Sequence, residues 1–197
     1  MNEEDVKKIR LQDCPTEHKK WKTLSEYRME ISPLINNLTS NFFDYYNIVE
    51  KIAEQLMALD YLISLELWLI PFSTIGKRHK SIFIQQLCSV YESLLELFVN
   101  NQINQVKNLY PIINNETLNN KFNTLGILVK KIDKTNIFNA KQVKYLKDLA
   151  EYRNLIHLSK KETNEIIEWF NQQSTKDLRE QLDKFVTFME KNIKNDD

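Results

Sequence analysis

Glycine is almost absent from this chain, and that scarcity narrows the folds that it can adopt. Only 2 of its 197 residues are glycine and only 4 are proline. A many-stranded sheet needs these residues at its turns, so their rarity favours helices. A chain of this length can bury a sizeable core as one domain. Its 42% hydrophobic and 27% charged residues are typical of ordinary globular proteins.

Apolar residues recur at steps of three and four, the spacing of amphipathic helices. The pattern predicts helices over residues 38–70, 81–101, 122–131, 141–158, 163–172 and 175–194, with Pro71 and Gly76 ending the first. Residues 1–35 are polar and are interrupted by Pro15 and Pro33, so we expect an N-terminal arm with short helical pieces. Residues 36–197 are expected to form one all-α helical bundle of about five to seven helices.

The positions of the cysteines and histidines argue against disulfides, metals and cofactors. Cys14 and Cys88 are far apart and suggest no disulfide framework, so we expect a reducing, cytoplasmic setting. His18, His79 and His157 are scattered, with no cysteine or carboxylate at the spacing of metal ligands. Two glycines are too few for a phosphate-binding loop. We therefore expect neither a metal nor a cofactor.

The most apolar run, Ala58 to Phe72, is too short to cross a bilayer. It is 15 residues long and contains Asp60 and Glu66, whereas a membrane helix needs roughly 20 predominantly apolar residues. The charged N-terminus also differs from a signal peptide. The run is expected to be a buried helix and no membrane association is predicted.

Charge is unevenly distributed, although the net charge is zero. Residues 121–161 carry ten Lys/Arg against three Asp/Glu, and the segments on either side are acidic. Such a local surplus can attract an anionic partner. The alternative is an ordinary solvated lysine face.

Within the basic segment, the stretch EYRNLIHL (residues 151–158) places two polar residues on an apolar helix face. At about 100° per residue, Arg153 and His157 fall in the same sector as Val143, Leu146 and Leu149. A charge there is costly unless it is paired.

Two interpretations of this pair are open. In the structural one, Arg153 pairs with a carboxylate of the helix over 81–101, Glu92 or Glu96, and His157 is a core histidine. In the functional one, Arg153 and His157 address one phosphate, the arginine by a charge-assisted contact and the histidine by proton transfer.

The segment LGILVKKIDKTNIFNAKQVKYLKDLAEYRNLIHL resembles the C-terminal half of HEPN-superfamily domains. A helix bearing two lysines is followed by a turn, then by a helix ending in arginine, asparagine, two apolar residues and histidine. The earlier IQQLCSVYESLLELF is similar to a core helix of that family. Arg153, Asn154 and His157 carry the resemblance as a motif.

The resemblance implies a small helical bundle that commonly forms a homodimer. Active HEPN members are metal-independent endoribonucleases, often in toxin–antitoxin or phage-defence systems. There the ribose 2′-hydroxyl attacks the adjacent phosphate; Arg153 would hold the phosphate, His157 would transfer protons and Asn154 would orient the pair. The lysines expected to attract RNA are Lys144, Lys147, Lys160 and Lys161.

The motif spacing departs from that of the family. Three residues separate Arg153 from His157, whereas the family places four to six between them. This leaves open a catalytically silent module that binds a partner protein or a second copy, with Arg153 and His157 as polar anchors. An immunity-type inhibitor of a basic partner is a further alternative, suggested by the acidic segments at both ends.

Overall fold

Seven helices and no strand make up the part of the chain that the computed structural model describes, residues 22–38, 42–66, 74–109, 124–134, 137–157 and 165–192. The helices are α2 (Leu24–Leu38), α3 (Phe42–Glu66), α4 (Thr74–Leu109), α6 (Leu125–Asp133), α7 (Ala140–His157), α8 (Glu165–Gln172) and α9 (Thr175–Asn192). The all-α prediction is confirmed.

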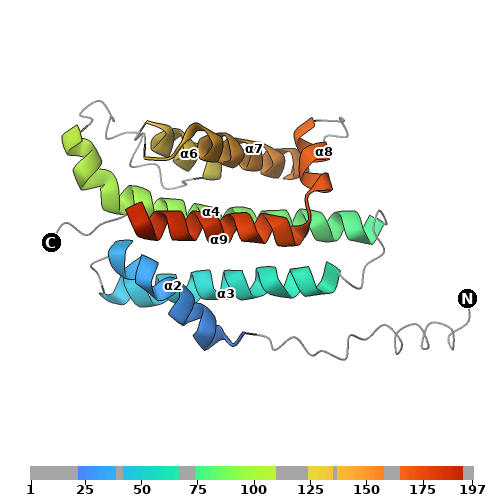
Figure 1. The fold of residues 1–197 in the computed structure, drawn as a ribbon, viewed down its shortest axis with the longest axis horizontal. Helices are drawn as coiled ribbons and strands as arrows, with labels where there is room; N and C mark the ends of the chain where they lie inside the picture. Colours follow the sequence, from blue (N-terminus) through green and yellow to red (C-terminus); the bar gives the residue numbers. More distant parts are fainter. Residues whose placement is uncertain are drawn as a thin grey trace, which may run out of the picture.

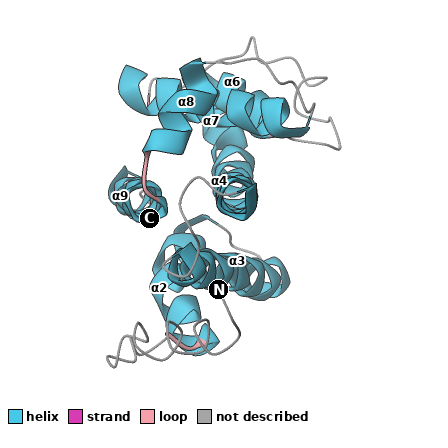
Figure 2. Cartoon of the chain, turned by 90° about the vertical axis from the view of Figure 1, so that its right-hand side faces the viewer, coloured by secondary structure: helices cyan, strands magenta, loops and turns pink. Residues whose placement is uncertain are grey.

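The helices lie in three layers (Figures 1 and 2). The pair α2 and α3 forms one outer layer, α4 and α9 lie side by side in the middle, and α6, α7 and α8 form the other outer layer. The long helix α4 contacts α3 on one side and α6 and α7 on the other. It therefore joins the two halves of the bundle.

Burial identifies α4 as the core helix. Between Arg78 and Val99, only Arg78, Ile82 and Glu96 are exposed. This stretch is long and apolar enough to cross a membrane, but 61% of its most apolar part is buried within the protein. Its apolar residues are therefore covered by neighbouring helices, as is usual for the core helix of a bundle.

Three helices begin with a cap formed by residues three apart in sequence. At α2, the Thr23 N–H donates to Glu26 Oε2 at 2.6 Å and the Glu26 N–H donates to Thr23 Oγ1 at 3.3 Å. At α7, Asn139 and Gln142 exchange the same pair of hydrogen bonds, both at 3.0 Å. The Ser174 hydroxyl accepts the Asp177 N–H at the start of α9. Such caps satisfy main-chain donors that a helix leaves unpaired.

The expected boundary between an arm and the bundle, after residue 35, falls inside α2. Pro33 lies within this helix instead of ending it. A helical proline costs a hydrogen bond, but Ile31, Leu34 and Ile35 around it are almost completely buried. The described bundle thus begins by residue 24.

The helix expected over residues 38–70 corresponds to α3, Phe42–Glu66, and Leu38 belongs to α2. Residues 39–41 and 67–73 lie outside the described part of the chain. Gly76 lies inside α4, which starts at Thr74 and runs to Leu109. Glycine weakens a helix by only about 1 kcal/mol, which the burial of α4 outweighs.

A buried arginine fastens α9 to α2 and α3. Arg179 is only 7% exposed; its Nε donates to Asp60 Oδ1 at 3.0 Å, and its guanidinium also pairs with Asp183 and lies 3.8 Å from Glu30. The Tyr27 hydroxyl donates to the other Asp60 oxygen at 2.6 Å. Burial acts to lower the pKa of Arg179, but these carboxylates outweigh it and raise that pKa above its ordinary value.

We expect Arg179→Ala to lower the free energy of unfolding by about 3 kcal/mol or more, because it leaves Asp60 half-buried without its cation. Chemical denaturation followed by circular dichroism measures this. Lys176→Ala, at an exposed position of the same helix, is the matched control and should change stability by less than about 0.5 kcal/mol. Equal effects of the two variants would contradict the role assigned to Arg179.

Candidate functional site

Arg153 lies on α7 and pairs with Glu92 on α4. Its Nη1 donates to Glu92 Oε1. The side chains are 27% and 19% exposed, respectively, so the pair lies at the edge of the core. Of the two carboxylates expected as partners of Arg153, Glu92 is the one that binds it.

Glu92 also caps the start of α6. The same Oε1 accepts the main-chain N–H of Leu125 at 2.7 Å. Thr124, at the N-cap position, makes no capping hydrogen bond with its own side chain. Because the first main-chain donors of a helix need partners and favour negative charge, Glu92 supplies from α4 what α6 lacks locally. One carboxylate thus joins α4, α6 and α7.

Glu96, the other expected partner, lies one turn further along α4 and is exposed. Its charge acts on Lys131 of α6, which is only 7% exposed. Burial lowers the pKa of Lys131, and Glu96 opposes this effect. Glu96 therefore belongs to the contact between α4 and α6.

The rest of the motif is only partly described. Asn154 is exposed, and no hydrogen bond between its side chain and another described residue is present. His157 is the last residue of α7, one turn after Arg153, and its side chain lies outside the described residues. The structure therefore gives a partner to the arginine of the motif but tests no contact between arginine and histidine.

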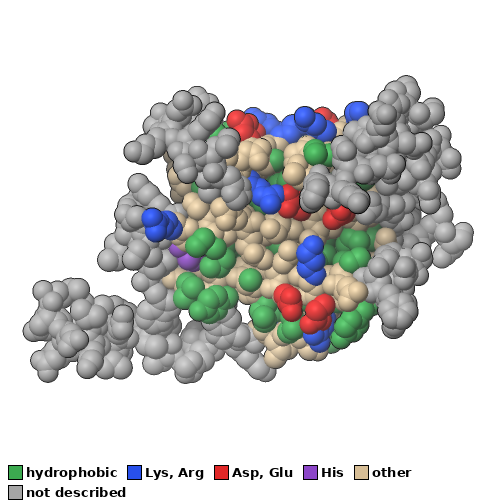
Figure 3. Space-filling view, turned by 180° about the vertical axis from the view of Figure 1, so that it is seen from behind, with side chains coloured by type: hydrophobic (Ala, Val, Ile, Leu, Met, Phe, Trp, Pro, Cys, Tyr) green, Lys and Arg blue, Asp and Glu red, His purple; other side chains and the backbone are tan. Residues whose placement is uncertain are grey.

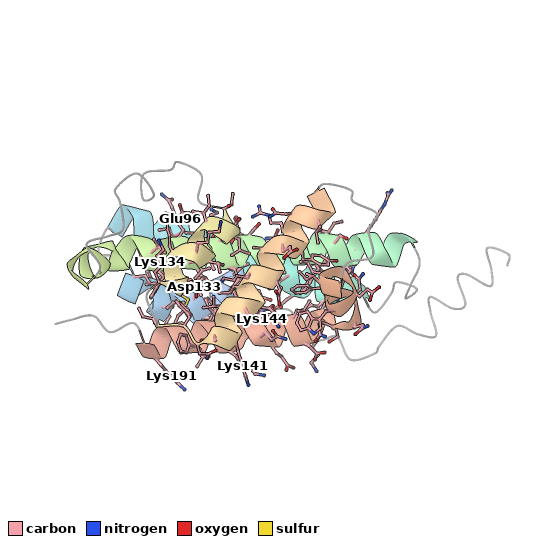
Figure 4. All side chains as sticks on the ribbon, turned by 90° about the horizontal axis from the view of Figure 1, so that it is seen from above. Glu96, Asp133, Lys134, Lys141, Lys144 and Lys191 are labelled. Carbon is pink, nitrogen blue, oxygen red and sulfur yellow. The ribbon has the colours of Figure 1, made fainter. Side chains whose placement is uncertain are left out.

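Two of the four predicted RNA-binding lysines are placed on α7. Lys144 and Lys147 are both exposed, and Lys147 pairs with Asp133 at 2.7 Å. Figure 4 shows Lys144 and Lys141 on the outer layer, with Lys134 at the end of α6. The other two, Lys160 and Lys161, lie outside the described residues.

The described lysines of the basic segment lie on that outer layer. In the rear view, Lys and Arg side chains gather along the edge formed by α6 and α7, interspersed with acidic ones (Figure 3). The rest of the visible surface mixes both charges with hydrophobic groups. In this view the basic side chains form a band along the outer layer, with acidic residues among them.

Cys88 lies beneath the Arg153 pair but is not prepared for chemistry. Its thiol is buried and lies 3.8 Å from the Leu149 carbonyl. Burial raises the pKa of the thiol far above its ordinary value, although the positive charge of Arg153 opposes this effect. A thiol in this state is not a nucleophile near neutral pH.

Charged residues that the sequence interpretation did not single out have clear structural roles. Lys80 of α4 is 8% exposed and donates to the main-chain carbonyl of Gln173, the residue after α8. Like Arg179 and Asp60, Lys80 is a charged residue at the border of an apolar helix face. The same helix-face test that singled out Arg153 could have found these residues.

Neither a metal site nor a similar known protein adds to what can be said of the function. The described residues contain no group of three or more His, Cys, Asp or Glu that could hold a metal ion. No family model, curated protein or solved structure matches this chain.

We expect Arg153→Ala to lower the free energy of unfolding by about 1–3 kcal/mol, as for loss of a charge-assisted hydrogen bond at a partly buried site. Glu92→Ala should cost more, because it also uncaps α6. A double-mutant cycle with both changes should give a coupling of about 0.5–3 kcal/mol. Asn154→Ala, the exposed neighbour, serves as the control; if it costs as much as Arg153→Ala, the pair is not structural.

Proposed function

We propose that this chain is a HEPN-like cytoplasmic protein that binds RNA along the basic band of α7 without cleaving it. The observation that carries the proposal is the engagement of Arg153. Its guanidinium shares Glu92 Oε1 with the first N–H of α6. An arginine held in this way contributes to the fold, whereas phosphate binding in a nuclease needs its donors to be available.

The cost of releasing Arg153 supports this reading. A phosphate that took the guanidinium from Glu92 would leave a carboxylate that is only 19% exposed without its cation. Breaking such a pair leaves an uncompensated charge. Glu92 would also have to cap α6 without Arg153 to hold it in place, because it is the only side-chain cap described for that helix. The paired arrangement therefore favours the catalytically silent alternative.

The lysines of α7 support RNA as the ligand. Lys141 and Lys144 are exposed one turn apart, and no described residue forms an ion pair with either. Lysines spaced along a helix can neutralise successive phosphates and release their counterions. Contacts of this kind bind the nucleic acid backbone without reading its sequence.

A metal-independent endoribonuclease acting as a homodimer is the second candidate. The partial exposure of Arg153, at 27%, favours it, because a phosphate could approach the donors that Glu92 does not use. Glu92 would then orient the guanidinium, and His157, one turn further on, would transfer protons. In this candidate a second copy would bring its own Arg153 and His157 to the same cleft.

We expect wild-type protein to bind a fluorescent single-stranded RNA with an affinity that falls steeply with salt. Fluorescence anisotropy titrations at several salt concentrations measure this. Lys144→Glu combined with Lys147→Glu should weaken binding at least about fivefold, because it reverses charge where phosphates would lie. Lys51→Glu, at an exposed position of α3, is the control. Unchanged affinity in the double variant would place the RNA elsewhere.

Cleavage separates the two candidates. We expect no RNA cleavage by wild-type protein in EDTA, with the oligomeric state measured on the same sample. Metal-independent cleavage that is lost in folded Arg153→Ala and His157→Ala variants would establish the endoribonuclease instead. Absence of both binding and cleavage would reject an RNA function and leave a module for a partner protein, such as an immunity-type inhibitor.

A further inference from the structure

A cavity of about 220 Å³ is lined by residues of α4, α7 and α9. Tyr91 of α4 lies at its base, and its other walls come from the first half of α7 and the middle of α9. The cavity is distinct from the Arg153 pair, which involves the C-terminal end of α7. It shares Lys141 with the basic band of α7, but its aromatic walls are separate from the proposed RNA-binding surface.

The walls of the cavity are mainly aromatic and aliphatic. The apolar lining consists of Tyr91, Tyr145, Leu146 and Phe185. The rings of Tyr91 and Phe185 meet edge to face, with centroids 5.0 Å apart, and those of Tyr91 and Tyr145 do so at 6.0 Å. Further ring contacts hold these side chains in place from behind, since Tyr145 packs against Phe170. Such a rigid aromatic lining suits a flat apolar group.

Two lysines and two glutamines supply the polar part of the lining. Lys141 comes from α7 and Lys184 from α9, with Gln142 and Gln181 beside them. Both lysines are exposed, and neither forms an ion pair with a described residue. No acidic residue lines the cavity; Asp183, which precedes Lys184 in sequence, is paired with Arg179.

The position of Gln142 is fixed by a separate task. Its Oε1 accepts the N–H of Asn139 at 3.0 Å in the cap of α7. This leaves its side-chain N–H groups to donate, as the lysine ammonium groups do. The polar donors of the cavity thus match a ligand group that accepts hydrogen bonds and carries negative charge.

We propose that this cavity binds a small molecule with one apolar ring and one anionic group, a carboxylate or a phosphate. The ring lies among Tyr91, Tyr145 and Phe185, and the anion lies between Lys141 and Lys184. The cavity volume limits the size of the ligand, because it is below the roughly 300 Å³ at which sites for drug-sized ligands begin. A single ring with a short side chain fits this limit.

Ligand-observed NMR and calorimetry with the full chain test the proposal. The probes are 3-phenylpropionate and phenyl phosphate, which separate the two anionic groups, and the neutral control is 3-phenylpropanol. We expect at least one anionic probe to bind with a dissociation constant of about 1 mM or tighter, and the alcohol to bind at least about fivefold more weakly.

Three variants locate the site. Lys141→Glu with Lys184→Glu should weaken anionic probe binding at least about fivefold by reversing charge at the rim. Lys176→Glu, exposed on α9 but not part of the lining, should leave it unchanged. Gln181→Trp should abolish it by filling the cavity; if that variant does not fold, the lysine pair decides.

Two results would overturn the proposal. One is failure of both anionic probes to bind the folded wild-type protein. The other is anionic-probe binding that the lysine variants leave unchanged, or binding of the neutral alcohol that is as tight as that of the anionic probes. Such binding would need neither the charge of the lysines nor this cavity. Binding by only one of the two anionic probes supports the site and identifies its preferred anion.

Discussion

The burial of α4 between two layers of helices is the constraint on which the rest of the structure depends. Because its neighbours cover most of it, the few charged side chains that it carries inward need partners, and they find them at the ends of short helices. Glu92 accepts the first N–H of α6, and Lys80 donates to the carbonyl that follows α8. Negative charge at a helix start and positive charge at a helix end also complement the helix dipole. These two contacts link the start of α6 and the end of α8 to α4.

This arrangement explains why a charged pair on an apolar helix face need not be a catalytic site. Arg153 lies in the sector of α7 that turns toward α4, and Glu92 meets it there. A guanidinium in that place stabilises the packing of three helices. A phosphate bound by Arg153 would have to compete with Glu92 for the guanidinium. The balance between binding and cleavage therefore depends on the free energy of the Arg153–Glu92 contact.

Local pattern predicted α3, α4 and the helices from α6 to α9, but it predicted only short helical pieces where α2 lies. The caps at Thr23–Glu26 and Asn139–Gln142 join residues three apart and are visible in sequence. Pro33 and Gly76 pointed to breaks that do not occur, because the energy gained by burying α2 and α4 exceeds what these residues cost locally. The Glu92 cap of α6 joins residues 33 apart, beyond the reach of any local signal.

The sequence by itself determined that the chain is helical, which faces of the helices are apolar, and that Arg153 needs a partner. Those properties depend on residue type and on spacing of three or four, which are local. Only the tertiary structure decided that Glu92 rather than Glu96 binds Arg153, that Arg179 meets Asp60, and that residues of α4, α7 and α9 together line a cavity. Each of these depends on how helices far apart in the chain rotate and pack, which is set by the whole core together.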